Sequence, residues 1–201
     1  MVIFTDYFYK LKQCAEQNGG IITAKSAEAC GISRAMLCKL NKAEVITRIT
    51  KGQYVLYSEL QDELFSLSLR SDNIIFSHET ALWLHGISDR TPFEHSVTVP
   101  TGKNPSLSIR ENCRVYSIKP EYFNLGKILL TTQHGNSVPV YDLERTVCDT
   151  VRSRNKMSSE TVNAALKAYA VRKDKNLNLL YTYSQKLGIE TVIRRYAEVL
   201  L

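Results

Sequence analysis

The basic residues between positions 34 and 51 have types and spacing suited to contacts with a nucleic acid. Arg34, Cys38 and Lys42 recur every four residues, so on a helix they share one face, with Ala35 and Lys39 beside them. The forked guanidinium of an arginine can pair with a guanine edge, which makes Arg34 the expected base contact. Contacts with phosphates, which give affinity and salt dependence, are expected from Lys39, Lys42, Arg48 and Lys51.

The segment that positions these side chains, residues 23–42, has the pattern of two helices joined by a tight turn. Ala27 is small enough for a second helix to cross close by, and Gly31 tolerates the positive φ that the turn requires. Thr23 and Ser33 are good N-caps for the two helices. Thr23 is also a candidate phosphate contact at a helix N-terminus, and Ser33 belongs to the expected DNA-binding set.

A β-hairpin is expected directly after the second helix. Leu37 and Leu40 fall on the inward face of that helix. The β-rich runs 45–49 and 53–57 follow it and are joined by residues 50–52, where a glycine suits a tight turn. A hairpin in this place is a wing, so residues 1–57 are predicted to form a winged helix-turn-helix that binds double-stranded DNA.

The charge of the chain is unevenly distributed. The chain has 201 residues and a net charge of +6, with a net +4 in residues 1–57, −4 in 58–151 and +6 in 152–201. Basic ends favour polyanionic partners, although a solvated helical exterior would look the same. The C-terminal residues considered as a functional surface are Arg152, Arg154, Lys156, Lys167, Arg172, Lys173, Arg194 and Arg195.

Residues 58–201 are predicted to form an α+β domain with a small mixed or antiparallel sheet followed by helices. Ser77 is expected to cap a helix with its side chain. The domain is expected to comprise a sheet-containing part, 58–150, and a helical part, 151–201. The expected strands are 97–99, 113–118, 128–132 and 138–141, and the expected later helices are about 143–153, 159–172, 177–187 and 190–200.

Several segments in the same order carry a resemblance to a known family. They are RITKGQY (48–54), SHETALWLHGIS (77–88), VTVP (97–100), YDLERTVCD (141–149) and AALKAY (164–169). Together with the winged motif, this series resembles the AbiEi antitoxins of bacterial type IV toxin–antitoxin and abortive phage infection systems.

The resemblance implies a division of labour. The N-terminal domain would repress its own operon by binding inverted repeats in the promoter. The C-terminal domain would counteract a nucleotidyltransferase-like toxin without a stable complex, and the basic residues after position 151 are the candidate antitoxin surface.

An enzymatic alternative rests on a carboxylate–histidine set that could support metal-assisted phosphoryl chemistry, as in a nuclease targeted by the winged domain. Its members are His78, Glu79, Asp142, Glu144 and Asp149. A structural role explains these carboxylates more simply, because a carboxylate in the first turn of a helix offsets the helix dipole or forms an ion pair with an arginine. No phosphate loop or nucleophile elbow is present, so no catalytic residue is expected.

A third reading is a winged-helix regulator whose second domain binds a ligand or mediates assembly. The five cysteines have no CxxC spacing and the four histidines no metal-ligand spacing, so neither a metal nor a cofactor is expected. No long apolar run or secretory leader is seen, which favours a cytoplasmic protein without a membrane partner.

Overall fold

The computed structural model describes residues 2–57 and 61–200, and it divides the chain into two compact units. Unit 1 comprises Met1–Leu69 together with Thr131–Ser137, and unit 2 comprises Arg70–Leu130 and Val138–Leu201. The boundary expected after Tyr57 adjoins residues 58–60, which lie outside the described residues. Unit 1 therefore takes in a short helix and a loop beyond residue 57.

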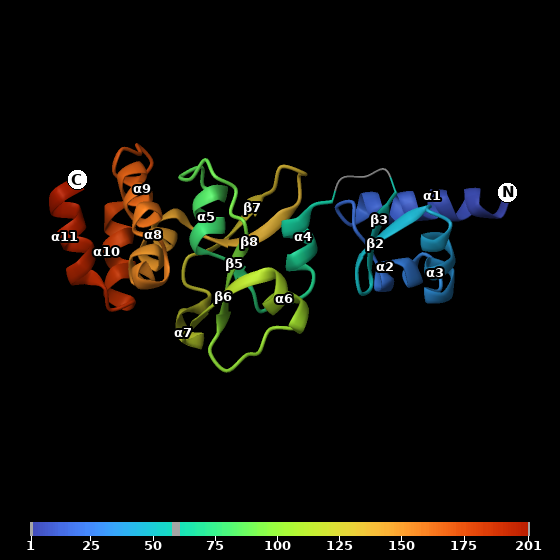
Figure 1. The fold of residues 1–201 in the computed structure, drawn as a ribbon, viewed down its shortest axis with the longest axis horizontal. Coiled ribbons are helices and arrows are strands. Elements are labelled where there is room, and N and C mark those ends of the chain that lie inside the picture. The colour runs from blue at the N-terminus through green and yellow to red at the C-terminus, as the bar shows by residue number, and fades with distance from the viewer. Residues whose placement is uncertain (1, 58–60, 201) are drawn as a thin grey trace. The chain divides into compact units, whose positions relative to one another are not determined.

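Unit 1 combines helices with a small antiparallel sheet whose strand order is β1-β3-β2. Its core is formed by side chains such as Leu11, Ile22, Leu37 and Leu40, none of which is exposed to solvent. Figure 1 shows these elements in blue to teal-green. They are α1 (Val2–Gln17), β1 (Ile22–Thr23), α2 (Ala24–Ala29), α3 (Arg34–Lys42), β2 (Ile46–Thr50), β3 (Gln53–Leu56) and α4 (Glu63–Ser68).

The loop 131–137 belongs to unit 1 because it is hydrogen bonded to the start of the chain and to α4. Asn136 Nδ2 donates to Gly19 O at 2.9 Å and to Asp62 Oδ2 at 2.9 Å. Thr132 Oγ1 also donates to Asp62 Oδ2, while Asp62 Oδ1 caps α4 by accepting from the Phe65 amide. The buried Asp62 carboxylate thus joins two segments that are far apart in the sequence.

Unit 2 contains a mixed five-stranded sheet with the order β6-β5-β4-β8-β7. β5 pairs antiparallel with β4 and parallel with β6, and β4 pairs parallel with β8. The strands are β4 (Ile75–Phe76), β5 (His95–Pro100), β6 (Cys113–Ile118), β7 (Lys127–Thr131) and β8 (Ser137–Tyr141). The helices are α5 (His78–Leu84), α6 (Leu107–Asn112), α7 (Pro120–Phe123), α8 (Leu143–Arg152), α9 (Ser159–Ala170), α10 (Leu177–Lys186) and α11 (Glu190–Leu200), with a 3₁₀ turn η1 at Arg154–Lys156.

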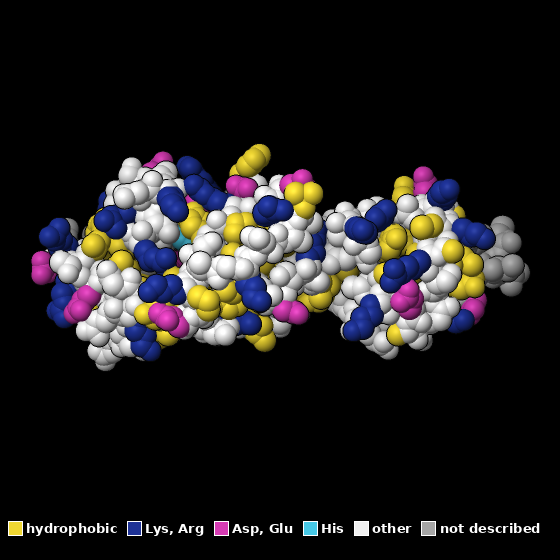
Figure 2. Space-filling model, turned by 90° about the horizontal axis from the view of Figure 1, so that it is seen from below, with side chains coloured by type: hydrophobic (Ala, Val, Ile, Leu, Met, Phe, Trp, Pro, Cys, Tyr) yellow, Lys and Arg dark blue, Asp and Glu magenta, His cyan; other side chains and the backbone are white. Residues whose placement is uncertain are grey.

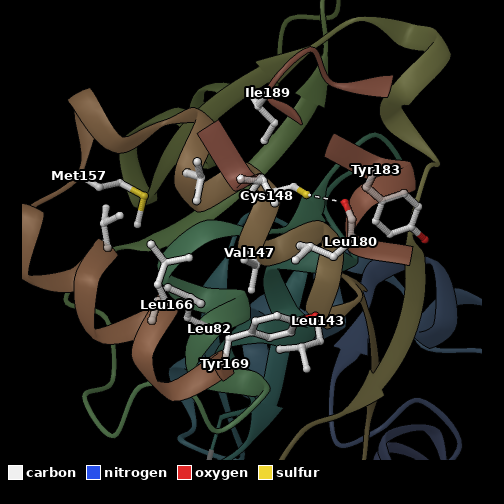
Figure 3. Close-up of a cluster of buried hydrophobic side chains, with 14 residues drawn as sticks. Leu82, Leu143, Val147, Cys148, Met157, Leu166, Tyr169, Leu180, Tyr183 and Ile189 are labelled. Atoms are coloured by element: carbon white, nitrogen blue, oxygen red, sulfur yellow. Dashed lines mark hydrogen bonds between the residues drawn. The ribbon is translucent and has the colours of Figure 1, made fainter. Parts of the chain in front are cut away.

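Helix α8 is the centre of unit 2, since every residue from Leu143 to Val151 is buried. It packs against α5, α9, α10 and α11. Figure 3 shows the apolar cluster between these helices, including Val147 and Cys148 of α8 and Leu180 of α10. The Cys148 thiol donates to the Leu180 carbonyl at 3.7 Å, and burial raises the pKa of this thiol.

The predicted α+β class and the four C-terminal helices are confirmed, each helix bound lying within about two residues of its expected place. The short helices α6 and α7 were not expected. The side-chain cap expected at Ser77 is wrong: Ser77 precedes α5, but its hydroxyl makes no capping bond and contacts His78 and Thr98 instead. Within the described ranges, no helix is long and apolar enough to cross a bilayer.

Candidate nucleic-acid interface

The connection between α2 and α3 is built as the sequence predicts. Thr23 Oγ1 accepts from the Ser26 amide at 3.0 Å, which completes a capping box at the start of α2. Gly31 has φ +77°, the left-handed conformation that a turn here requires. Ser33 Oγ accepts from the Met36 amide at 3.2 Å and so caps α3. Both predicted N-caps are confirmed.

Helix α3 has one buried and one exposed side. Leu37 and Leu40 are completely buried against unit 1, next to Ala27 of α2. The remaining surface of the helix carries basic groups without an acidic residue of its own. The exposed residues on it include all five predicted members of the recognition face: Arg34, Ala35, Cys38, Lys39 and Lys42.

The Arg34 side chain is engaged within the protein. Its Nε donates to Glu28 Oε1 of α2 at 2.8 Å, and both side chains are exposed. An ion pair of this kind is weak in water, so it exchanges easily for a contact with a base or phosphate. Sequence reasoning did not include Glu28, although its position six residues before Arg34 places it just across the turn.

The β2–β3 hairpin is attached to the C-terminal end of α3. Asn41 Oδ1 accepts from the Arg48 amide at 2.8 Å, and Arg48 Nε donates to Thr50 O at 3.2 Å. The register between the strands shifts after Arg48, which leaves Ile49 as an extra residue in β2. These contacts hold the Arg48 backbone at the last turn of α3, the turn that also contains Lys42.

The hairpin turn is attached to the first turn of α2. Gly52 has φ +79°, and its carbonyl accepts from the Ala24 amide at 2.8 Å. Thr23 pairs with Gln53 in the sheet, so the structure brings Thr23 and the exposed Lys51 to one edge of unit 1. The Thr23 hydroxyl donates to Ser26 Oγ at 3.0 Å, so its proton is already engaged within the capping box.

The acidic residues of the enzymatic alternative have structural partners in unit 2. Asp142 caps α8 and accepts from Tyr183 Oη, and Glu144 accepts from the Asn176 amide at 2.8 Å. Asp149 accepts from Arg145 Nε at 3.0 Å, and both side chains are nearly inaccessible to solvent. No group of three or more potential metal ligands occurs among the residues that the structure describes.

The structure does not gather the C-terminal basic residues into one surface. Arg172 bonds to Asp174 and to His85 O, Arg194 pairs with Glu190, and Arg154 donates to Val151 O at 3.0 Å. Figure 2 shows basic side chains interrupted by acidic and uncharged surface on the face drawn. Lys167, Lys173 and Arg195 are exposed on or near α9 and α11, whereas Arg152 and Lys156 line a common pocket.

Comparison with known proteins supports the sequence reading of unit 1. Residues 9–57 match the family model described as a transcriptional regulator, AbiEi antitoxin. This match confirms the resemblance to AbiEi antitoxins over the segment that contains α2, α3 and the hairpin. No curated protein matches the chain.

A solved structure with the same overall fold comes from Mycobacterium tuberculosis. The crystal structure of the RV2827C protein is 12% identical to this chain, with a TM-score of 0.50. The similarity covers 85% of this chain and 75% of that chain. At this identity the likeness concerns the fold alone.

Proposed function

We propose that this protein is a DNA-binding transcriptional repressor whose unit 1 is a winged helix-turn-helix. Helix α3 is the recognition helix and the β2–β3 hairpin is the wing. The observation that supports this best is α3 itself, which buries Leu37 and Leu40 and exposes Arg34, Lys39 and Lys42. A helix of this kind, rigidly held by one face and basic on the other, suits the major groove.

The test measures affinity for the DNA upstream of the protein's own gene, by fluorescence anisotropy over a range of salt concentrations. The double variant Lys39→Gln/Lys42→Gln removes two expected phosphate contacts. Its affinity should fall, and the slope of log affinity against log salt should become less steep by about 1.8, or about 0.9 for each contact.

The matched control is Lys10→Gln/Lys12→Gln, which removes the same charge from exposed positions of α1. If both double variants lose affinity equally, the effect is one of net charge and the assignment of α3 as the recognition helix is wrong.

We further propose that the protein is the antitoxin of a type IV toxin–antitoxin pair that acts in the cytoplasm in abortive phage infection. The family match over residues 9–57 supports this role. In this proposal unit 1 binds inverted repeats in the promoter, and unit 2 counteracts a nucleotidyltransferase-like toxin without enzymatic activity and without a stable complex.

The two roles separate in a co-expression experiment with a nucleotidyltransferase-like gene adjacent to the protein's own gene. Full-length Lys39→Gln/Lys42→Gln protein, expressed from an unrelated promoter, should still protect cells while failing to repress a reporter. Loss of protection in this variant, despite normal protein levels, would contradict the division of labour between the units.

A further inference from the structure

A polar pocket opens on unit 2 beside the end of α8. It holds about 700 Å³ of space not filled by protein atoms, part of it open to solvent. Strands β5 and β6 contribute Thr98 and Tyr116, and α5 contributes His78. The segment from the end of α8 through η1 contributes Arg152, Ser153 and Lys156. This lining places hydroxyl groups, an imidazole and two cations around one space.

The charge balance of the pocket favours an anion. Arg152 and Lys156 are exposed, so their cationic groups are available at the opening. Asp149 supplies a carboxylate to the lining, but it is buried and hydrogen bonded to the buried Arg145, with Arg152 at 3.7 Å. Arg114 lies nearby, since its guanidinium donates to the Lys156 carbonyl, but its charge is paired with Glu79 at 3.4 Å, so the balance rests on Arg152 and Lys156 against Asp149. The cations therefore outnumber the carboxylates around the space.

His78 remains neutral in these surroundings. It is 3% exposed, and its ring stacks on that of Tyr116 with a centroid distance of 3.4 Å. Burial lowers the pKa of His78 well below its usual value, and the charges of Arg152, Arg145, Arg114 and Lys156 lower it further. A neutral imidazole has one nitrogen that donates and one that accepts.

A chain of hydrogen bonds runs through His78 and favours one tautomer. Thr98 Oγ1 donates to Ser77 Oγ at 2.8 Å, and His78 Nδ1 lies 2.9 Å from the same oxygen, where it can accept the Ser77 proton. In this tautomer His78 Nε2 carries the ring proton and donates to Ser153 Oγ at 2.9 Å. The Ser153 hydroxyl thus keeps its own proton for an acceptor in the pocket.

Two local departures from regular structure support this arrangement. His78 has φ +47°, in the left-handed region that a non-glycine residue rarely adopts. Ser77 leaves the start of α5 without a side-chain cap and directs its hydroxyl toward the His78 ring. Strained residues are retained where the surrounding structure holds them, and they concentrate at ligand sites.

We propose that this pocket binds the phosphate group of a small phosphorylated molecule. Arg152 and Lys156 supply the positive charge, and Ser153 donates a hydrogen bond that His78 orients. Ser153 is partly buried between the two basic residues, so a terminal phosphate can reach its hydroxyl. The site uses other residues than the DNA-binding surface proposed on α3. The proposal does not depend on the antitoxin role.

Isothermal titration calorimetry with the full-length protein tests this site. The probes are inorganic phosphate, pyrophosphate and ATP, at about 0.15 M salt to suppress non-specific attraction. The Arg152→Gln/Lys156→Gln variant should bind the three probes about tenfold more weakly or worse. The affinity of Ser153→Ala for the same probes should fall about tenfold, as expected for the loss of a hydrogen bond to a charged group. Comparison of the affinity for inorganic phosphate with the affinity for ATP shows whether the pocket recognises the phosphate alone or a whole nucleotide.

The control variant Lys173→Gln/Arg195→Gln removes the same charge from exposed positions outside the pocket, and it should bind like the unmodified protein. Equal losses in the pocket and control variants would overturn the proposal, as would the absence of binding for all three probes. Binding of a DNA duplex alone that depends on Arg152 and Lys156 would also overturn it. The Lys39→Gln/Lys42→Gln variant should bind the probes normally, so this test fails or succeeds independently of the DNA-binding proposal.

Discussion

Arg34 Nε donates to the Glu28 carboxylate at 2.8 Å, so the residue expected to contact a base is held by the preceding helix. The pair lies on the surface, where its own contribution to stability is small. In the DNA-binding function proposed above, the pair should weaken binding, because the Glu28 carboxylate both engages the guanidinium and repels phosphates.

Glu28→Gln should therefore strengthen DNA binding by about three- to tenfold, as a change of one charge near the phosphates suggests. The melting temperature of the protein should change little. Anisotropy titrations of the upstream DNA measure the affinity. Glu16→Gln, which removes the same charge from an exposed position of α1, is the control. An equal gain in both variants would show that the Glu28–Arg34 contact has no part in binding.

Acid should destabilise the protein through His78. The pKa of His78 in the folded chain lies well below its usual 6.5, so the unfolded chain takes up the proton first as the pH falls. The contribution of His78 is fully present above pH 6.5 and is lost as the pH falls below this value. The free energy of unfolding should decrease there by up to about 1.4 kcal/mol per pH unit.

His78→Asn should remove this part of the pH dependence, since asparagine tolerates a positive φ but does not titrate. Urea unfolding at a series of pH values measures how the free energy of unfolding depends on pH. His134→Asn, which removes an exposed histidine, is the comparison. A slope that is unchanged in His78→Asn would contradict the neutral state assigned to His78.

Gly19 should be less tolerant of alanine than its neighbour Gly20. Both have positive φ, so each substitution costs about 1–2 kcal/mol in backbone strain. A Cβ at Gly19 would also lie 1.9 Å from Asn136 Oδ1 and 2.8 Å from Phe65 Cε1, whereas a Cβ at Gly20 meets nothing within 4 Å. Gly19→Ala should therefore lower the free energy of unfolding, measured with urea, by about 1–3 kcal/mol more than Gly20→Ala does. Equal losses would mean that the loop 131–137 does not pack against Gly19 in solution.

Local chemistry made the α2–α3 region predictable. The caps at Thr23 and Ser33 and the positive φ at Gly31 and Gly52 depend on residues a few positions apart, and the structure has all four. The C-terminal helices were predictable for the same reason, because their apolar periodicity and bounding residues lie within each segment.

Contacts between distant residues were not predictable in this way. Ser77 has the sequence position of a helix cap, but its hydroxyl bonds to Thr98, 21 residues away. The pocket depends on His78 meeting Ser153 across 75 positions, and neither residue type is unusual enough to signal it. Arg152 and Lys156 were among the expected basic residues, but only the fold places these two at a common pocket, whereas Arg172 and Arg194 pair with acidic residues elsewhere.

The assignment of Thr131–Ser137 to unit 1 means that this unit is not a continuous stretch of chain. Recombination between related proteins at a single crossover near residue 70 would exchange the N-terminal part of unit 1 alone. The Gly19 and Asp62 positions would then come from one parent, and the loop 131–137 that bonds to them from the other. Chimaeras that also exchange residues 131–137 should express better than single-crossover ones. The coding sequence of unit 1 is therefore inherited as two separated pieces that must remain compatible with each other.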